Sequence, residues 1–156
     1  DGYYYDTSYK FKVPYRLEAG MHTIRAFPAR SFGESLKGEN TFFATYFYVG
    51  EKKNNSAYDL NAPYLTYNEP TDQLPLTENL PILLDFYISN CELSSDGYKV
   101  KVEIDGIRQR TLTSWQPYYI YGLKRGRHTI RLQLLDPEGK VVPGAFNDTK
   151  RSFTVH

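Results

Sequence analysis

The chain has 156 residues, and its 19 Lys and Arg nearly balance its 18 Asp and Glu, so the net charge at pH 7 is +1. This balance provides neither the basic surface typical of nucleic-acid-binding proteins nor a signal for an acidic partner, and no nucleic-acid partner is expected. Hydrophobic residues make up 40% of the sequence, and the many Tyr and Phe residues favour β-strands. The single cysteine, Cys91, cannot form an intrachain disulfide.

An internal duplication organises the sequence. The phrase Gly-x-His-Thr-Ile-Arg stands at residues 20–25 and returns 106 residues later, at residues 126–131. Its recurring members are Gly20, His22 and Arg25 in the first copy, and Gly126, His128 and Arg131 in the second. The same offset pairs further residues: Leu17 with Leu123, Gly33 with Gly139, Phe47 with Phe153, and Val49 with Val155. A duplication of this length predicts two units of one fold.

Residues 1–50 correspond only to the latter half of a unit. Alternation predicts strands around residues 4–12, 23–28 and 43–49, and Asp1-Gly2 matches Asp105-Gly106 of the second copy. Three strands do not close a sandwich. We therefore expect this half-domain to be completed by further N-terminal strands, by a clipped segment that stays bound, or by strands of another chain. Strand exchange or dimerisation through residues 1–50 is one expected consequence.

Residues 51–62 are polar and rich in Asn and Lys, which predicts a linker short enough to hold two units end to end with limited freedom. The second copy, residues 63–156, is expected to be complete. Strands are predicted at residues 63–67, 80–88, 98–104, 108–113, 118–123, 127–135 and 150–155. Asp105-Gly106 predicts a tight hairpin turn, and the polar segment after it predicts an edge strand. About seven short strands are the signature of an immunoglobulin-like or fibronectin-type-III-like sandwich.

The recurring histidines invite a functional interpretation. No repeated Asp, Glu or Cys accompanies them, and Glu18, near His22, is replaced by Lys124 in the second copy. Each histidine starts a strand on its apolar face. We interpret His22 and His128 as structural imidazoles that hydrogen-bond a loop carbonyl, and not as catalytic or metal-ligating residues.

The sequence contains no nucleophile elbow, phosphate-binding glycine loop, HExxH or CxxC motif. No enzymatic activity, catalytic residue, metal or cofactor is therefore predicted. The candidate ligand-binding residues are aromatic: Trp115, Tyr118 and Tyr119, with Tyr9 at the position equivalent to Trp115. Exposed in a flat row, they would stack on sugar rings or contact a protein; buried, they would belong to the core and to the seam between units.

The corner Leu123-x-x-Gly126-x-His128, with its strand and the closing turn Asp136-Pro137-Glu138-Gly139, resembles the penultimate-strand region of bacterial immunoglobulin-like modules. The first copy departs from the pattern after Arg25, so a longer or bent loop is expected there. The resemblance implies an all-β fold of tandem immunoglobulin-like sandwich repeats, the first present only as its C-terminal half. It also implies an extracytoplasmic location, in the periplasm, at the bacterial cell surface or secreted.

We therefore predict a non-catalytic structural or interaction module, a spacer or adhesive element of a larger protein. Its partners would be other domains of the parent chain or an envelope protein. The alternative is a carbohydrate-binding module that uses exposed Trp and Tyr side chains.

Overall fold

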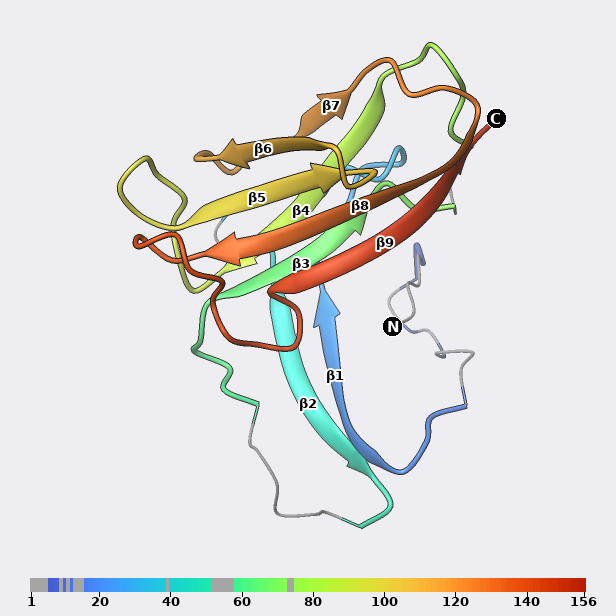
Figure 1. Cartoon of the computed structure of the whole chain (residues 1–156). Coiled ribbons are helices and arrows are strands. Elements are labelled where there is room, and N and C mark those ends of the chain that lie inside the picture. The colour runs from blue at the N-terminus through green and yellow to red at the C-terminus, as the bar shows by residue number, and fades with distance from the viewer. Residues whose placement is uncertain are drawn as a thin grey trace.

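The computed structural model describes residues 6–8, 10, 12, 16–38, 40–51, 58–72 and 75–156. Within these ranges nine strands form three sheets with antiparallel pairing (Figure 1). The strand expected around residues 4–12 and the turn Asp1-Gly2 fall largely outside the described residues. Where residues of that segment are described, at 6–8, 10 and 12, they are not in a strand.

The second half of the chain forms a closed sandwich of two sheets. One sheet has the order β3-β4-β7 and the other the order β6-β5-β8-β9. The strands of the first sheet are β3 (Tyr64–Glu69), β4 (Ile82–Ser89) and β7 (Tyr118–Ile120). Those of the second are β5 (Lys99–Ile104), β6 (Arg108–Leu112), β8 (Gly126–Leu135) and β9 (Asp148–Val155). Three antiparallel strands packed on four, in this order, make an immunoglobulin-like sandwich, which confirms the all-β fold class.

The core of the sandwich follows the alternation of the sequence. In β4, Ile82, Leu84, Phe86 and Ile88 are all buried, as the pattern predicts. Facing them from the other sheet, Ile130, Leu132 and Leu134 of β8 are completely buried. Alternate side chains of a strand point to opposite faces, so each strand contributes one apolar row to the space between the sheets.

The predicted hairpin turn is present between β5 and β6. Asp105 and Gly106 have φ angles of 53° and 72°, and the Ile107 N–H donates to the Ile104 carbonyl at 3.1 Å. Two positive φ angles in succession define the type I′ turn, whose twist matches that of the strands it joins. The strand that follows, β6, lies at the edge of its sheet, as its polar sequence predicts.

The first half of the chain contains a separate hairpin of β1 (Gly20–Ala26) and β2 (Phe43–Val49). Gly20 pairs with Val49 and His22 with Phe47, whereas Gly126 pairs with Val155 and His128 with Phe153. The two hairpins therefore share one register at the 106-residue offset. Whereas β8 continues to Leu135, β1 ends at Ala26. Pro28, two residues later, has no N–H to donate to a continued ladder, and the chain turns away.

The β1–β2 hairpin projects from the sandwich (Figure 1). The loop that connects its two strands lies against the sandwich. The loop packs on the outer face of β3 and β4, through contacts given below. As a result all six residues of β3 are buried. One row of its side chains faces the core of the sandwich, and the other faces the hairpin and its loop.

The two hairpins provide a matched test of burial. Ile130 is 0% exposed and Ile24, its equivalent in β1, is 39% exposed. We expect Ile130→Ala to lower the free energy of unfolding by about 2–5 kcal/mol because it leaves a cavity. Ile24→Ala should cost less than about 1 kcal/mol because its side chain is already in contact with water. Urea denaturation measures both; equal losses would contradict the exposure of the β1 face.

Candidate functional site: the junction between hairpin and sandwich

A buried carboxylate lies at the centre of the junction. Asp85 alternates with the core residues of β4 and therefore points to the outer face, yet its side chain is 0% exposed. Lys37 Nζ lies 2.5 Å from its Oδ1, and the Ser35 N–H donates to its Oδ2 at 3.1 Å. Asn68 Nδ2 donates to the same Oδ2 at 2.8 Å. A buried charge is tolerated only when it is paired and hydrogen-bonded, so this cluster depends on the loop staying in place.

The loop reaches Asp85 through a tight local structure. Asn68 Nδ2 also donates to the Gly33 carbonyl at 2.6 Å, and Gly33 has a φ of 92°, which a glycine adopts without steric cost. Lys37 Nζ donates to Ser35 Oγ at 3.0 Å. Gly33, Ser35, Lys37, Asn68 and Asp85 are called the Asp85 cluster below. Its members come from the β1–β2 loop, β3 and β4, so it joins the two halves of the chain.

An aromatic stack borders the Asp85 cluster. The Tyr87 ring stacks with both Phe27 and Phe42, whose ring centroids are 5.4 Å and 4.7 Å away. Trp115 meets the same ring edge-on at 4.7 Å. The Thr41 and Tyr87 hydroxyls form a hydrogen bond of 2.7 Å. Such aromatic pairs each contribute about 0.5–1.5 kcal/mol beyond the area that they bury.

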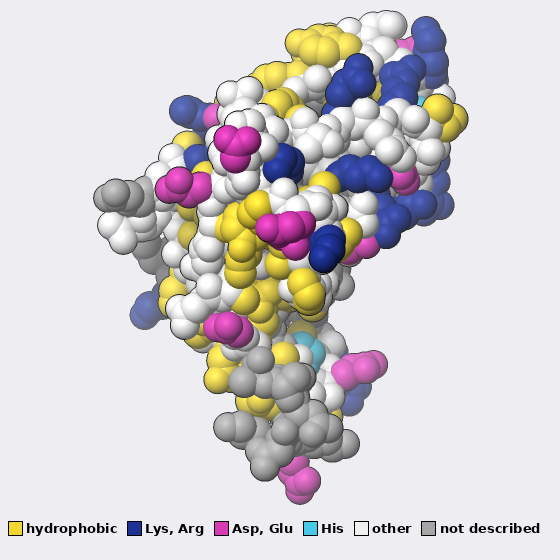
Figure 2. All heavy atoms as spheres, turned by 60° about the vertical axis from the view of Figure 1, so that its left-hand side comes forward, with side chains coloured by type: hydrophobic (Ala, Val, Ile, Leu, Met, Phe, Trp, Pro, Cys, Tyr) yellow, Lys and Arg dark blue, Asp and Glu magenta, His cyan; other side chains and the backbone are white. Residues whose placement is uncertain are grey.

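Arg25 fixes the end of β1 itself to the sandwich. Its Nη1 donates to Thr66 Oγ1 of β3 at 2.8 Å, and its guanidinium carbon lies 3.5 Å from the centroid of the Phe146 ring. A cation over an aromatic face is attracted by the ring quadrupole. Tyr58, within the predicted linker, stacks on Tyr64 at 4.8 Å beside this contact. Figure 2 shows hydrophobic side chains gathered where the hairpin meets the sandwich.

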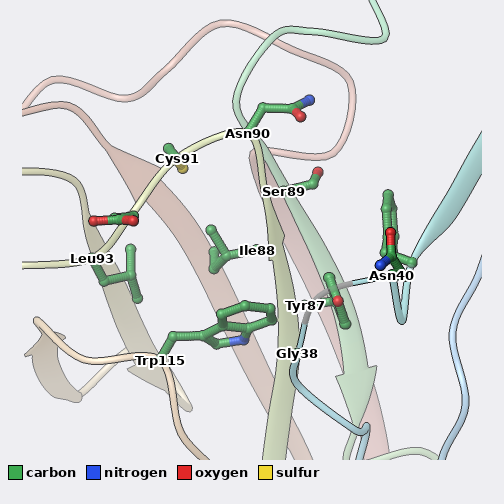
Figure 3. A pocket seen from close by; sticks show the side chains of 11 residues that line it. Gly38, Asn40, Tyr87, Ile88, Ser89, Asn90, Cys91, Leu93 and Trp115 are labelled. Atoms are coloured by element: carbon green, nitrogen blue, oxygen red, sulfur yellow. The ribbon is translucent and has the colours of Figure 1, made fainter.

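A cleft of about 640 Å³ opens beside the aromatic stack (Figure 3). Trp115, Tyr87 and Asn40 lie around it, from the segment before β7, from β4 and from the β1–β2 loop. Trp115 Nε1 donates to the Phe86 carbonyl at 2.9 Å. Asn90 Nδ2 donates to the Leu60 and Ala62 carbonyls at 2.7 Å and 2.8 Å. Both polar groups already have hydrogen-bond partners within the protein. Because the lining residues come from the β1–β2 loop and from the sandwich, this cleft is part of the seam between them.

The cleft also contains the single cysteine. Burial raises the pKa of the Cys91 thiol to about 11. At neutral pH the group is therefore a protonated thiol, which is a poor nucleophile and a poor metal ligand.

The candidate ligand-binding residues do not form a flat row. Trp115 is partly buried against Tyr87, and Tyr118 packs on the core, where its ring is 6.4 Å from Phe86. Tyr119 follows Tyr118 in β7, points to the other face and is 47% exposed. Tyr9 lies outside the described residues. The structure therefore brings Trp115 to the junction and leaves Tyr119 apart from it.

Both repeat histidines donate to a loop carbonyl four residues earlier, the contact expected of a structural imidazole. His22 Nε2 donates to the Glu18 carbonyl at 2.8 Å, and His128 Nε2 donates to the Lys124 carbonyl at 2.7 Å. His128 makes a further hydrogen bond through Nδ1, at 2.8 Å to Asp105 Oδ2. Carbonyl and carboxylate oxygens only accept, and a histidine ring donates from both nitrogens only as the imidazolium, so this arrangement favours the charged form of His128.

This pair shifts the pKa of both partners. Burial by itself would lower the pKa of His128, but its hydrogen bonds to Asp105 and to the Lys124 carbonyl outweigh burial, and the pKa is raised above 6.5. Burial would raise the pKa of Asp105, but the hydrogen bonds from His128 and from the Thr129 N–H bring it below its usual value.

Sequence reasoning missed Asp85 and Lys37, and it named Arg25 only as a member of the repeat phrase. Asp85 stands in the apolar run Leu84-Asp85-Phe86. The only signal was a charged residue inside a strand with otherwise strong core character. Its partner, Lys37, is 48 residues away in the chain, which no local pattern could reveal.

No protein-family model matches the chain, and no curated protein sequence matches it. Among solved structures, the chain is similar to the crystal structure of the CARDB domain of a Pyrococcus furiosus protein in complex with di-metal ions. The TM-score is 0.42 and the identity 15%, over 64% of this chain and 97% of that domain. Over the described residues, no three or more His, Cys, Asp or Glu side chains are grouped to hold a metal ion. The same part of the chain contains no helix with the length and apolar character of a membrane span.

The Asp85 cluster can be tested against a surface ion pair. Lys37 and Asp85 have side chains 13% and 0% exposed, whereas Arg131 and Asp148 have side chains 40% and 36% exposed. We expect Asp85→Ala to lower the free energy of unfolding by about 3–5 kcal/mol, because it leaves a buried ammonium unpaired. Asp148→Ala is the control and should cost no more than about 1 kcal/mol. Urea denaturation of the two variants decides; a cost for Asp85→Ala as small as that of the control would contradict the buried pair.

The His128–Asp105 pair predicts a pH dependence. A folded-state pKa above the unfolded value means that His128 stabilises the fold fully below pH 6.5, and that this contribution is lost as the pH rises through the folded pKa. Asp105 has the opposite sign, because its pKa is lowered: its contribution is lost as the pH falls below its usual range. NMR titration of the imidazole should give a midpoint above 6.5, and Asp105→Asn should lower that midpoint. An unchanged midpoint in the variant would show that the pair does not hold the proton.

Proposed function

We propose that this chain is a non-catalytic structural module of a larger extracytoplasmic protein, in which two immunoglobulin-like units are fixed in one orientation. The observation that carries the proposal is the Asp85 cluster. A carboxylate that is 0% exposed and satisfied by a loop from the other half of the chain disfavours separation of the halves. Opening the junction would separate Asp85 from Lys37, which costs free energy because each charge loses its partner. Domains joined only by a flexible linker can move apart without this cost.

The tandem arrangement is supported by the equivalence of the two hairpins. They have the same pairing register, and both histidines donate to a carbonyl four residues earlier. The histidine rings also lie over equivalent phenylalanines, with centroids 5.6 Å apart for His22 and Phe47 and 5.8 Å apart for His128 and Phe153. We infer that β1 and β2 are the last two strands of a first unit, as β8 and β9 are of the second.

A spacing role is favoured because the charged side chains of the junction and of the repeat motif serve structural contacts. Lys37 pairs with Asp85, Arg25 holds Thr66 and Phe146, and Arg131 pairs with Asp148 at 2.6 Å. The extracytoplasmic part of the proposal is supported by the resemblance of the corner at Gly126 and His128 to bacterial immunoglobulin-like modules. The carbohydrate-binding alternative gains no support, since Trp115 and Tyr118 are partly buried against the core and only Tyr119 of the three is exposed.

The fixed orientation is tested by measuring a distance across the junction. Spin labels would be placed at Met21 in β1 and at Glu138 in the turn after β8, both exposed, in a Cys91→Ser background. We expect electron double-resonance spectroscopy to give one narrow distance distribution. Asp85→Ala should broaden it, because the loop loses its anchor, and Asp148→Ala, on the sandwich alone, should leave it narrow. A broad distribution without either substitution would refute the fixed junction.

A further inference from the structure

The two equivalent hairpins differ in what flanks them. In the sandwich, β8 lies between β9 and β5, with Ile104 of β5 paired to Ile130. In the hairpin, β1 pairs with β2, and among the described residues no strand pairs with its other edge. That edge carries a row of backbone groups able to pair with a further strand.

The apolar face next to this edge is incompletely covered. Leu17 is 38% exposed and its equivalent Leu123 is 6% exposed. Phe47 is half-buried, whereas its equivalent Phe153 is 0% exposed. Together with Ile24, compared above with Ile130, these residues form a face that the second unit covers completely and the first does not. The second unit therefore shows, residue by residue, what kind of element covers such a face.

The free edge of β1 also carries two polar groups, the His22 ring and the Thr23 N–H, whose equivalents in β8 both bind Asp105. Asp105, at the end of β5, accepts from His128 Nδ1 and from the Thr129 N–H, each at 2.8 Å, and its own N–H donates to the Thr129 carbonyl at 2.9 Å. The equivalents in β1 are His22 and Thr23. Because the register is shared, the Thr23 backbone amide points away from β2. His22 uses Nε2 on the Glu18 carbonyl, and within the described residues its Nδ1 makes no hydrogen bond.

We propose that the free edge of β1 receives an antiparallel strand from another protein, an extended segment whose aspartate binds His22 and Thr23 as Asp105 binds His128 and Thr129. Asp1, which matches Asp105 in sequence, lies outside the described residues. This deepens the proposed function, because it rests on β1 and β2 being the end of a first immunoglobulin-like unit. The strand has the pattern of β5, with apolar residues opposite Ile24 and Ala26 where Ile104 and Val102 stand opposite Ile130 and Leu132. Addition of a strand to an exposed sheet edge is a general mode of peptide recognition.

A second copy of the chain fits this edge less well. Its own β5 lies between β6 and β8, with Val100 and Val102 buried in the core. To donate that strand, the second copy would have to open its sandwich. The occupant is therefore an extended segment that is not already part of a closed sheet.

The test uses the sequence of residues 98–106 (YKVKVEIDG) as a synthetic peptide, added to the protein of residues 1–156. We expect saturable 1:1 binding that shifts the NMR signals of the His22 ring and of the Thr23 amide and leaves those of His128 unchanged. Replacing the peptide's aspartate by asparagine should weaken binding about tenfold, because a charge-assisted hydrogen bond is lost. Methylation of that aspartate's backbone nitrogen should weaken it further, since this N–H pairs with the strand. These changes leave the protein itself intact.

Two protein variants complete the test. His22→Ala should weaken binding of the peptide about tenfold. His156→Ala is the control, because no hydrogen bond of its imidazole is found among the described residues, and it should bind as the original protein does. Equal binding of a peptide with the same residues in scrambled order would overturn the proposal. So would peptide-independent dimerisation of the protein that protects the Thr23 amide, because a second copy would then occupy the edge.

The outcome is separable from that of the proposed function. Absence of peptide binding, with a narrow distance distribution between the labels at Met21 and Glu138, would overturn the strand site and leave the fixed junction standing. A broad distribution with peptide binding intact would do the reverse. Each result therefore bears on one of the two proposals.

Discussion

The arrangement of this protein depends on one buried charge. Asp85 points out of the sandwich and would be an ordinary surface carboxylate if nothing covered it. It is instead 0% exposed, because the loop between β1 and β2 brings Lys37 and the Ser35 N–H to it. Burying a carboxylate is unfavourable unless its partners stay in place, so the loop, the hairpin and the sandwich are held in one arrangement. The aromatic stack on Tyr87 and the contacts of Arg25 further stabilise the hairpin and its loop in the arrangement that Asp85 specifies.

The duplication explains how one motif can serve two purposes. Arg25 and Arg131 occupy equivalent positions, but Arg131 pairs with Asp148 at the surface and Arg25 holds Thr66 and Phe146 across the junction. The strands diverge just after these residues. Because β8 continues for four residues beyond Arg131, it extends along its sheet, whereas β1 stops at Ala26 and is followed by the loop that docks on the sandwich. The hairpin is shared, and the loop distinguishes the two copies.

Much of the fold could be predicted from the sequence, because its causes are local. The rows of apolar residues in β4 and β8 are visible as simple alternation, and Asp105-Gly106 indicates a type I′ turn by residue type alone. The edge position of β6 followed from its polar residues. The burial of β3 could not be predicted in this way. Thr66 and Asn68 look like solvent-facing residues of an outer sheet. Both are buried, and they contact Arg25 of β1 and Gly33 of the loop, which are 41 and 35 residues away in sequence.

The sequence by itself determined the all-β class, the positions of most strands, the duplication and the placement of both histidines on an apolar face. Each of these depends on neighbours within a strand or turn, or on a repeated phrase. Only the tertiary structure decided that Asp85 meets Lys37, that Trp115 packs on Tyr87 and that His128 forms a hydrogen bond with Asp105. Those contacts join segments 48, 28 and 23 residues apart. The packing of the loop and the sheets decides which distant side chains come into contact. Alternation along a strand depends only on near neighbours in sequence and does not predict these contacts.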